Sequence, residues 1–343
     1  MLPHDGRPPA APVRLIEAEG LAAAIRATVP AGGAAGSPEV ETRLAFLEGL
    51  SGSDLWRGQL VADGGVLDRL DRLGAETPNA ARAVAVARHA AALSRSTASS
   101  LRLPPLVLSG PPGSGKTRFA LALAAALGAP AEVVAGTVLS DPGPLAGYGV
   151  AFRGAGPGRL ARALLAASTL GVAMVVDEAD KIGDAYAGQR TMDVLLPLLE
   201  AGTAETFEDA YLGVPMRADG VSWILTANDL GALSGPLLDR CVVVEMPALD
   251  GRARAAAVSR VVAEEAARCG LAQGGLSPEA EALLGEVAPR RARLAVRLAW
   301  GAALGAGRAR AERDDVEAAL RLSRSERHGL GRIGFAAGSW ADL

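Results

Sequence analysis

The side chains best suited to chemistry in this sequence lie in one glycine-rich stretch. It reads Gly110-Pro111-Pro112-Gly113-Ser114-Gly115-Lys116-Thr117. An apolar run at 106–108 precedes it and a helix-forming stretch at 116–127 follows it, which is the strand, loop and helix order of a phosphate-binding loop. Glycines let successive backbone N–H groups face phosphates, and the helix N-terminus adds partial positive charge. We therefore expect a site for a nucleoside triphosphate.

Two side chains of this loop have distinct expected roles. Lys116 would reach the β- and γ-phosphates, and the Thr117 hydroxyl would be a ligand of Mg²⁺. Lys116 and Lys181 are the only lysines of the chain, which has 35 Lys and Arg residues together. A sequence that otherwise uses Arg keeps Lys where a compact charge suits phosphates better than a planar fork. The composition thus supports the phosphate-binding interpretation.

A pair of carboxylates, Asp177 and Glu178, follows the apolar run of a later predicted strand. Open α/β sheets bind ligands at the carboxyl ends of their strands, which is where the phosphate-binding loop also lies. We expect Asp177 to hold Mg²⁺ through water, and Glu178 to orient and deprotonate the attacking water. Acidic pairs also serve as helix caps, but their position downstream of a phosphate-binding loop favours the catalytic role.

Two polar residues after the next strand extend this site. Asn228 could hydrogen-bond the attacking water or the γ-phosphate, although a turn would also explain an Asn there. Arg240 cannot easily reach its own nucleotide, but in a ring of subunits it could reach a neighbour's γ-phosphate. The alternative is a surface Arg240 paired with Asp239. We expect Asn228 and Arg240 to act in catalysis.

Short apolar runs alternating with helices predict an α/β fold with a parallel sheet covered on both faces. The predicted strands are at 106–109, 131–135, 172–176, 222–226 and 241–245. Helical patterns precede them at 15–29, 40–50, 60–73 and 77–94, and follow them at 252–269, 278–287, 290–304 and 313–322. Arg290, at the start of one of the later helices, is our candidate for a second nucleotide sensor, a role that Arg291 or Arg293 could also take.

These patterns divide the chain into four segments. Residues 1–100 are a helical N-terminal region with a disordered start and a linker near 30–38, and they contain no catalytic constellation. Residues 101–248 are the nucleotide-binding α/β domain, 249–325 a helical lid domain, and 326–343 a C-terminal tail. The N-terminal region is interpreted as an adaptor or an oligomerisation region.

Composition narrows the function classes. A net charge of −3 gives no general reason to expect nucleic acid as a partner. The start of the chain has no signal-peptide core, and no stretch reaches the roughly 18 apolar residues of a membrane helix. Cys241 and Cys269 have no metal-binding spacing and fit a reducing compartment. We expect a cytoplasmic protein without a membrane partner.

Taken together, these motifs resemble those of AAA+ ATPases, and the closer match is the ATPase module of Lon proteases. Besides the phosphate-binding loop, the resemblance rests on Asp177-Glu178-Ala179-Asp180-Lys181-Ile182, on 207–215, on Thr226-Ala227-Asn228 and on Gly235-Pro236-Leu237-Leu238-Asp239-Arg240. It covers residues 103–305. It implies a P-loop AAA+ sheet domain followed by a helical lid, ATP and Mg²⁺ as ligands, ATP hydrolysis, a homo-oligomeric hexameric ring and a protein substrate.

The resemblance also concerns two features outside the nucleotide site. Residues 152–158 match the Lon loop in which an aromatic residue grips substrate polypeptide in the pore, which implies that Phe152 is that residue. Arg153 stands where Lon usually has an aliphatic residue, and a plain glycine-rich surface loop is the alternative. Residues 326–343 are too few for Lon's Ser–Lys protease domain, so we expect a motor without its own protease.

Three hypotheses follow. The leading one is an ATP-driven ring that remodels or unfolds protein partners through pore loops. A nucleic-acid motor or loader is suggested by the arginines at 290–297 and 308–313, although interspersed carboxylates favour a solvated helix face. The third is a nucleotide-dependent switch that assembles a partner complex.

Overall fold

The computed structural model describes residues 10–29, 37–183, 190–271 and 275–323. The chain forms two compact units, Met1–Ala248 and Leu249–Leu343. Three predicted features lie wholly or mostly outside the described residues. They are the disordered start, of which residues 1–9 are not described, most of the linker near 30–38, and the whole tail at 326–343.

The first unit is built on a parallel sheet that, in the described part of the chain, has five strands in the order β4-β5-β8-β3-β9. The strands are β3 (Leu106–Ser109), β4 (Ala131–Ala135), β5 (Ala173–Asp177), β8 (Ser222–Ala227) and β9 (Val242–Glu245). Each lies within one residue of its predicted bounds, and all four pairings are parallel. The predicted α/β fold class is confirmed.

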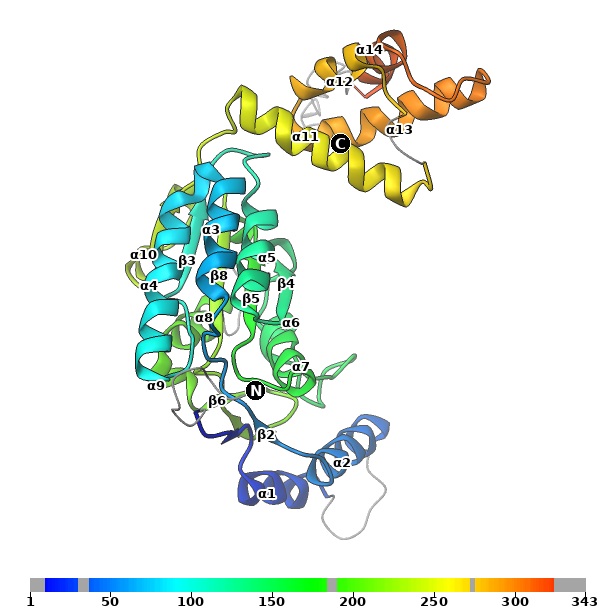
Figure 1. Ribbon diagram of the computed structural model, residues 1–343. Helices are drawn as coiled ribbons and strands as arrows, with labels where there is room; N and C mark the ends of the chain where they lie inside the picture. The colour runs from blue at the N-terminus through cyan, green and yellow to red at the C-terminus, as the bar shows by residue number, and fades with distance from the viewer. Residues whose placement is uncertain (1–9, 30–36, 184–189, 272–274, 324–343) are drawn as a thin grey trace, which may run out of the picture. The chain divides into compact units, whose positions relative to one another are not determined.

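The sheet is buried on both faces because successive side chains of each strand point to opposite sides. Leu106, Leu108 and Val175 pack with helices α3 (Val66–Glu76), α4 (Ala81–Thr97) and α5 (Lys116–Leu127) on one face. Val107 and Met174 pack on the other face with α7 (Arg159–Ala166) and α8 (Thr191–Leu199). Figure 1 shows α3, α4 and α5 side by side over the sheet.

Short elements complete this unit between the main strands and helices. They are η2 (Pro78–Ala80), η3 (Gly136–Val138), α6 (Gly143–Ala146), η4 (Ala179–Lys181), α9 (Ala201–Ala204), η5 (Leu230–Ala232) and α10 (Gly235–Asp239). Two antiparallel pairs of two-residue strands were not predicted: β1 (Val13–Arg14) with β2 (Trp56–Arg57), and β6 (Phe207–Glu208) with β7 (Pro215–Met216).

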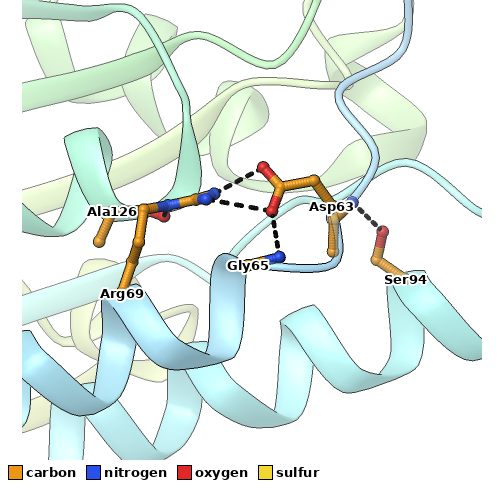
Figure 2. Close-up of polar contacts among 6 residues, drawn as sticks. Asp63, Gly65, Arg69, Ser94 and Ala126 are labelled. Carbon is orange, nitrogen blue, oxygen red and sulfur yellow. Dashed lines mark hydrogen bonds and ion pairs between the residues drawn. The ribbon is translucent and has the colours of Figure 1, made fainter. Parts of the chain in front are cut away.

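Helix α3 is fixed to the sheet domain by its first turn, as Figure 2 shows. Asp63 accepts hydrogen bonds from the Gly65 amide (2.8 Å) and from the Arg69 guanidinium (2.7 and 3.1 Å). Arg69 Nε in turn donates to the carbonyl of Ala126 at the end of α5 (2.7 Å). The prediction that this helix begins at 60 was wrong, because the Asp63 turn and Gly65 delay the helix to Val66. The N-terminal helices α3 and α4 therefore share the core of the sheet domain.

The first two helices, α1 (Ala18–Thr28) and α2 (Pro38–Ser51), pack against each other, and strands β1 and β2 flank them in the sequence. Arg57 on β2 is 7% exposed, and its guanidinium donates to the carbonyls of Leu164 (3.1 Å) and Leu165 (2.9 Å) in the last turn of α7. A cation at a helix C-terminus satisfies carbonyls that lack partners within the helix. Arg57 thus fixes β2 to the C-terminal end of α7.

The second unit is helical in its described part: α11 (Gly251–Arg268), α12 (Pro278–Gly285), α13 (Pro289–Gly305) and α14 (Arg313–Leu322). These bounds lie within two residues of the predicted ones. Its core consists mainly of alanine and valine residues around Trp300, whose indole N–H donates to the carbonyl of Gly275 (2.9 Å). The starts of α11 and α12 are capped by the side chains of Asp250 and Ser277. Among the described residues of either unit, no helix is long and apolar enough to cross a membrane.

Candidate functional site

The glycine-rich loop lies between the C-terminal end of β3 and the first turn of α5. A side chain at Gly110 is excluded, because its Cβ would lie 2.1 Å from the carbonyl oxygen of Met246. Gly115 has φ +91°, a left-handed conformation that glycine adopts without strain. The backbone geometry therefore requires glycine at the entry and at the exit of the loop.

Lys116 is folded back over this loop. It is 7% exposed, and its Nζ donates to the carbonyls of Gly110 (2.7 Å) and Pro111 (3.1 Å) and to Asn228 Oδ1 (2.9 Å). Burial lowers the pKa of Lys116, and the negative charges of Asp180, Asp177 and Glu178 oppose that shift. The hydrogen-bond partners of the ammonium are neutral oxygens, so its charge can bind an anion. Asn228 and Lys116, predicted as site residues from distant segments, lie in direct contact.

The two predicted magnesium ligands also meet. Thr117 Oγ1 donates to Asp177 Oδ1 at 2.5 Å, which joins the start of α5 to the end of β5. The hydroxyl of Thr226 on β8 donates to the same carboxylate oxygen at 2.7 Å. The Asp177 carboxylate is thus held by hydroxyl groups from two neighbouring elements, and a hydroxyl beside a carboxylate is a donor set that suits Mg²⁺ with phosphate oxygens.

Glu178 follows in a conformation that few residues adopt. Its backbone has φ 55° and ψ 51°, and its amide donates to Thr226 Oγ1 at 2.9 Å. A non-glycine residue in this region carries strain that the surroundings must offset, and such residues gather at functional sites. The side chain is exposed at the carboxyl edge of the sheet. Thr226 was not among the predicted site residues; a threonine near the end of the buried strand 222–227 is the signal that could have revealed it.

The loop itself fits a phosphate group. The Ser114 hydroxyl is buried and has no hydrogen-bond partner in the described part of the chain. Over the same described residues, the amides of Gly113, Gly115, Lys116 and Thr117 have no hydrogen-bond acceptor. Unpaired donors that converge on a helix N-terminus form an anion site. The triphosphate and Mg²⁺ expected from the sequence therefore match the donors and acceptors present.

The structure places Arg240 outside this contact network. It follows α10, where its Nε pairs with Glu200 Oε1 (2.6 Å) and its Nη1 donates to the carbonyl of Pro236 (3.0 Å). The pairing with Asp239 that we considered as an alternative is replaced by Glu200. The side chain of Arg240 is 37% exposed, so it can be approached from solvent.

The segment 147–158 forms a closed loop between α6 and α7. Tyr148 and Gly156 exchange backbone hydrogen bonds (3.0 and 3.2 Å) across its base. Phe152 lies in the turn, 62% exposed, and its ring centroid is 6.1 Å from that of Tyr148. Arg153 follows it and is exposed. An apolar side chain is thus presented to solvent beside a cation.

Arg290 belongs to the second unit, in the first turn of α13, and it is exposed. The two arginines that could replace it are bound within that unit. Arg291 donates to the carbonyl of Leu320 (3.0 Å), and Arg293 pairs with Glu264 (2.8 Å). Arg290 has no side-chain partner among the described residues, which keeps it our candidate sensor.

Comparisons with known proteins agree with this geometry. The family "ATPase family associated with various cellular activities (AAA)" matches residues 106–247. The loop, the carboxylate pair and the parallel sheet all lie within that match. Residues 106–247 therefore form an AAA domain.

The sequence relatives are more specific. A mitochondrial Lon protease homolog from Phaeodactylum tricornutum is 39% identical over 145 residues, which are 42% of this chain and 16% of the relative. A Lon protease from Frankia alni is 36% identical over 182 residues, 52% of this chain and 20% of the relative. The AAA domain is thus similar to the ATPase region of Lon proteases. The matched part spans a fifth or less of the length of these relatives.

A solved structure of a RuvB point mutant from Thermotoga maritima is also similar to this chain, with 16% identity and a TM-score of 0.49. The match covers 74% of this chain and 70% of that one.

Proposed function

We propose that this protein hydrolyses ATP with Mg²⁺ at the site between β3, β5 and β8. Lys116 and the unpaired loop amides bind the phosphates, while Thr117 and Asp177 hold Mg²⁺, which neutralises phosphate charge when bound. Glu178 takes a proton from the attacking water, and Asn228 orients that water or the γ-phosphate. The observation that carries the proposal is the convergence of Lys116, Asn228 and the Thr117–Asp177 pair at one edge of the sheet.

We propose further that Arg240 acts on the nucleotide of a neighbouring subunit in a ring, by analogy with the hexameric ring that the resemblance to Lon proteases implies. A complementation experiment tests this. Arg240→Ala and Glu178→Gln should each bind ATP but lack hydrolysis, and a mixture of the two should regain part of the activity. Recovery is expected because mixed interfaces combine an intact Glu178 with an intact Arg240. No recovery in mixed assemblies would assign Arg240 to its own subunit's site or to none.

The ring is proposed to remodel or unfold a protein partner, with Phe152 and Arg153 contacting the polypeptide. The exposed aromatic ring in a closed loop supports this, as does the similarity to Lon proteases. Phe152→Ala should then uncouple hydrolysis from remodelling, and unchanged remodelling would refute the threading mechanism. Arg290 is proposed as a sensor in a lid domain at 249–325, which follows an α/β domain at 101–248 in the sequence. A cytoplasmic location stays a prediction, since relatives include mitochondrial and peroxisomal proteins.

The class of partner can be tested with a substrate trap. Glu178→Gln should hold ATP without turning it over and so retain its partner, whereas Lys116→Met, which lacks bound nucleotide, is the matched control. The molecular mass of the trapped assembly is then measured, and the molecules bound to it are tested for protein and for sensitivity to nuclease. Protein specific to Glu178→Gln supports remodelling. Nucleic acid would favour the motor or loader, and a monomer without a partner would contradict the ring.

A further inference from the structure

A buried carboxylate outside the nucleotide site lies next to both ends of the loop 147–158, which carries Phe152 and is called the Phe152 loop. Asp209, between the short strands β6 and β7, is 0% exposed. Its Oδ1 accepts hydrogen bonds from the amides of Tyr211 (2.9 Å) and Leu212 (3.2 Å), and its Oδ2 accepts one from the amide of Gly158 (2.8 Å). A buried charge is retained where hydrogen bonds compensate its lost hydration. Its donors come from two segments that are distant in sequence.

Both ends of the 147–158 loop converge on this carboxylate. Gly158 at the C-terminal end donates to it directly. At the N-terminal end, Gly147 has φ +84°, and a Cβ there would lie 2.4 Å from Asp209 Oδ1. The amide of Ala210 also donates to the carbonyl of Ala146 at 2.7 Å. The loop is therefore clamped at its two ends by one side chain and its neighbouring backbone.

The clamp is supported from outside the loop. Arg162 lies near Asp209 with opposite charge, and its Nε donates to the carbonyl of Pro157 (2.7 Å). On the other side, the ring of Tyr211 packs edge-on against Phe46 of α2, with centroids 5.8 Å apart. Arg43, also on α2, donates to the carbonyl of Leu212 (2.9 Å). The turn that carries Asp209 is thus held by α2.

We infer that Asp209 is a positioning residue that holds the Phe152 loop in the orientation needed to contact a polypeptide. Its carboxylate is suited to this role because it accepts hydrogen bonds from the amide of Gly158 and from the amides of Tyr211 and Leu212 at the same time. The role in substrate contact rests on the proposed function, whereas the clamp itself rests on the hydrogen bonds alone. The two parts can therefore be tested separately.

The clamp is tested by limited trypsin digestion, because Arg153 lies in the clamped loop. In Asp209→Asn an amide NH₂ replaces one acceptor oxygen, so either Gly158 or the Tyr211–Leu212 turn loses its acceptor. Cleavage after Arg153 should become about tenfold faster or more, relative to cleavage within 249–323. Asp219→Asn, which removes a carboxylate paired with Arg217 elsewhere in the unit, is the matched control and should leave that rate unchanged. An unchanged rate in Asp209→Asn overturns the inference.

Two further measurements complete the test. In the unmodified protein the Gly158 amide should exchange hydrogen at least about tenfold more slowly than the loop amides at 153–154, and equal rates would refute the clamp even if Asp209→Asn does not fold. For function, the ratio of casein-stimulated to basal ATPase turnover should fall in Asp209→Asn as it does in Phe152→Ala. If cleavage accelerates while both variants keep the wild-type ratio, the clamp stands and the proposed polypeptide contact fails.

Discussion

Thr226 offers a sharp test of how the catalytic carboxylates are held. Its hydroxyl donates to Asp177 (2.7 Å) and accepts from the amide of Glu178 (2.9 Å), and the residue is 1% exposed. Thr226→Val keeps the shape of the side chain and removes both hydrogen bonds. The Glu178 amide then has no acceptor, and its left-handed backbone loses the contact that offsets its strain.

The magnitude follows from these two bonds. A hydrogen bond to a charged group is worth about 1.5–3 kcal/mol, and an amide left without a partner costs about 1–3 kcal/mol. We expect the free energy of unfolding to fall by about 3 kcal/mol. If about half of this displaces Glu178 from its catalytic position, kcat for ATP falls roughly tenfold, because 1.4 kcal/mol corresponds to a factor of ten. The hydrogen bonds of Lys116 do not involve Thr226, so ATP affinity should change little.

The assay is steady-state ATP turnover together with ATP binding by calorimetry. Thr226→Ser is the matched control, because it keeps the hydroxyl and loses one buried methyl group, worth about 0.8 kcal/mol. We expect Thr226→Ser to retain most of kcat at a slightly lower stability. If Thr226→Val turned over ATP as fast as Thr226→Ser, the hydroxyl would not position Glu178 and our reasoning about this site would be wrong.

Three further predictions follow. Lys116→Met should weaken ATP binding at least about 100-fold by calorimetry, since the phosphates lose a buried charge, whereas Lys181→Met, the matched control at the other lysine, should bind normally. Arg57→Leu should lower the free energy of unfolding in urea by about 3 kcal/mol, because the last carbonyls of α7 lose their donors, and a loss under about 0.5 kcal/mol would contradict the capping role. Burial raises the pKa of Cys241 to about 12, so its thiolate is scarce at pH 8 and grows only as the pH rises toward that value. A thiol reagent should therefore modify exposed Cys269 first, and equal rates at both cysteines in the folded protein would refute this.

The fold was predictable because its main elements carry strong periodic signals. The five parallel strands are short apolar runs bounded by glycine, proline or acidic residues, and each was found within one residue. The short pairs β1–β2 and β6–β7 were missed because two residues are too few to show alternation. The start of α3 was misplaced because apolar residues at 60–62 continue the helical pattern through a segment that is not helical and leads into the Asp63 turn.

The nucleotide site was predictable where residue type alone limits the chemistry. Lys116, Thr117, Asp177 and Asn228 come from three segments of the sequence, and their contacts follow from the parallel sheet. Asp209 could not be identified in this way, because a buried carboxylate reveals its role only through the backbone amides that donate hydrogen bonds to it, whereas Thr226 did leave a signal as a polar residue near the end of a buried strand. The Glu200 partner of Arg240 likewise depends on how the segment after α8 packs against α10.

Our central claim is that the site between β3, β5 and β8 hydrolyses ATP and that Glu178 activates the water. The most direct test is single-turnover hydrolysis of ATP with Mg²⁺ by the wild type and by Glu178→Gln, with ATP affinity measured on the same samples. We predict wild-type affinity in the variant and a hydrolysis rate at least about 100-fold lower, as general-base catalysis contributes about that much. Hydrolysis at the wild-type rate in Glu178→Gln would contradict the claim.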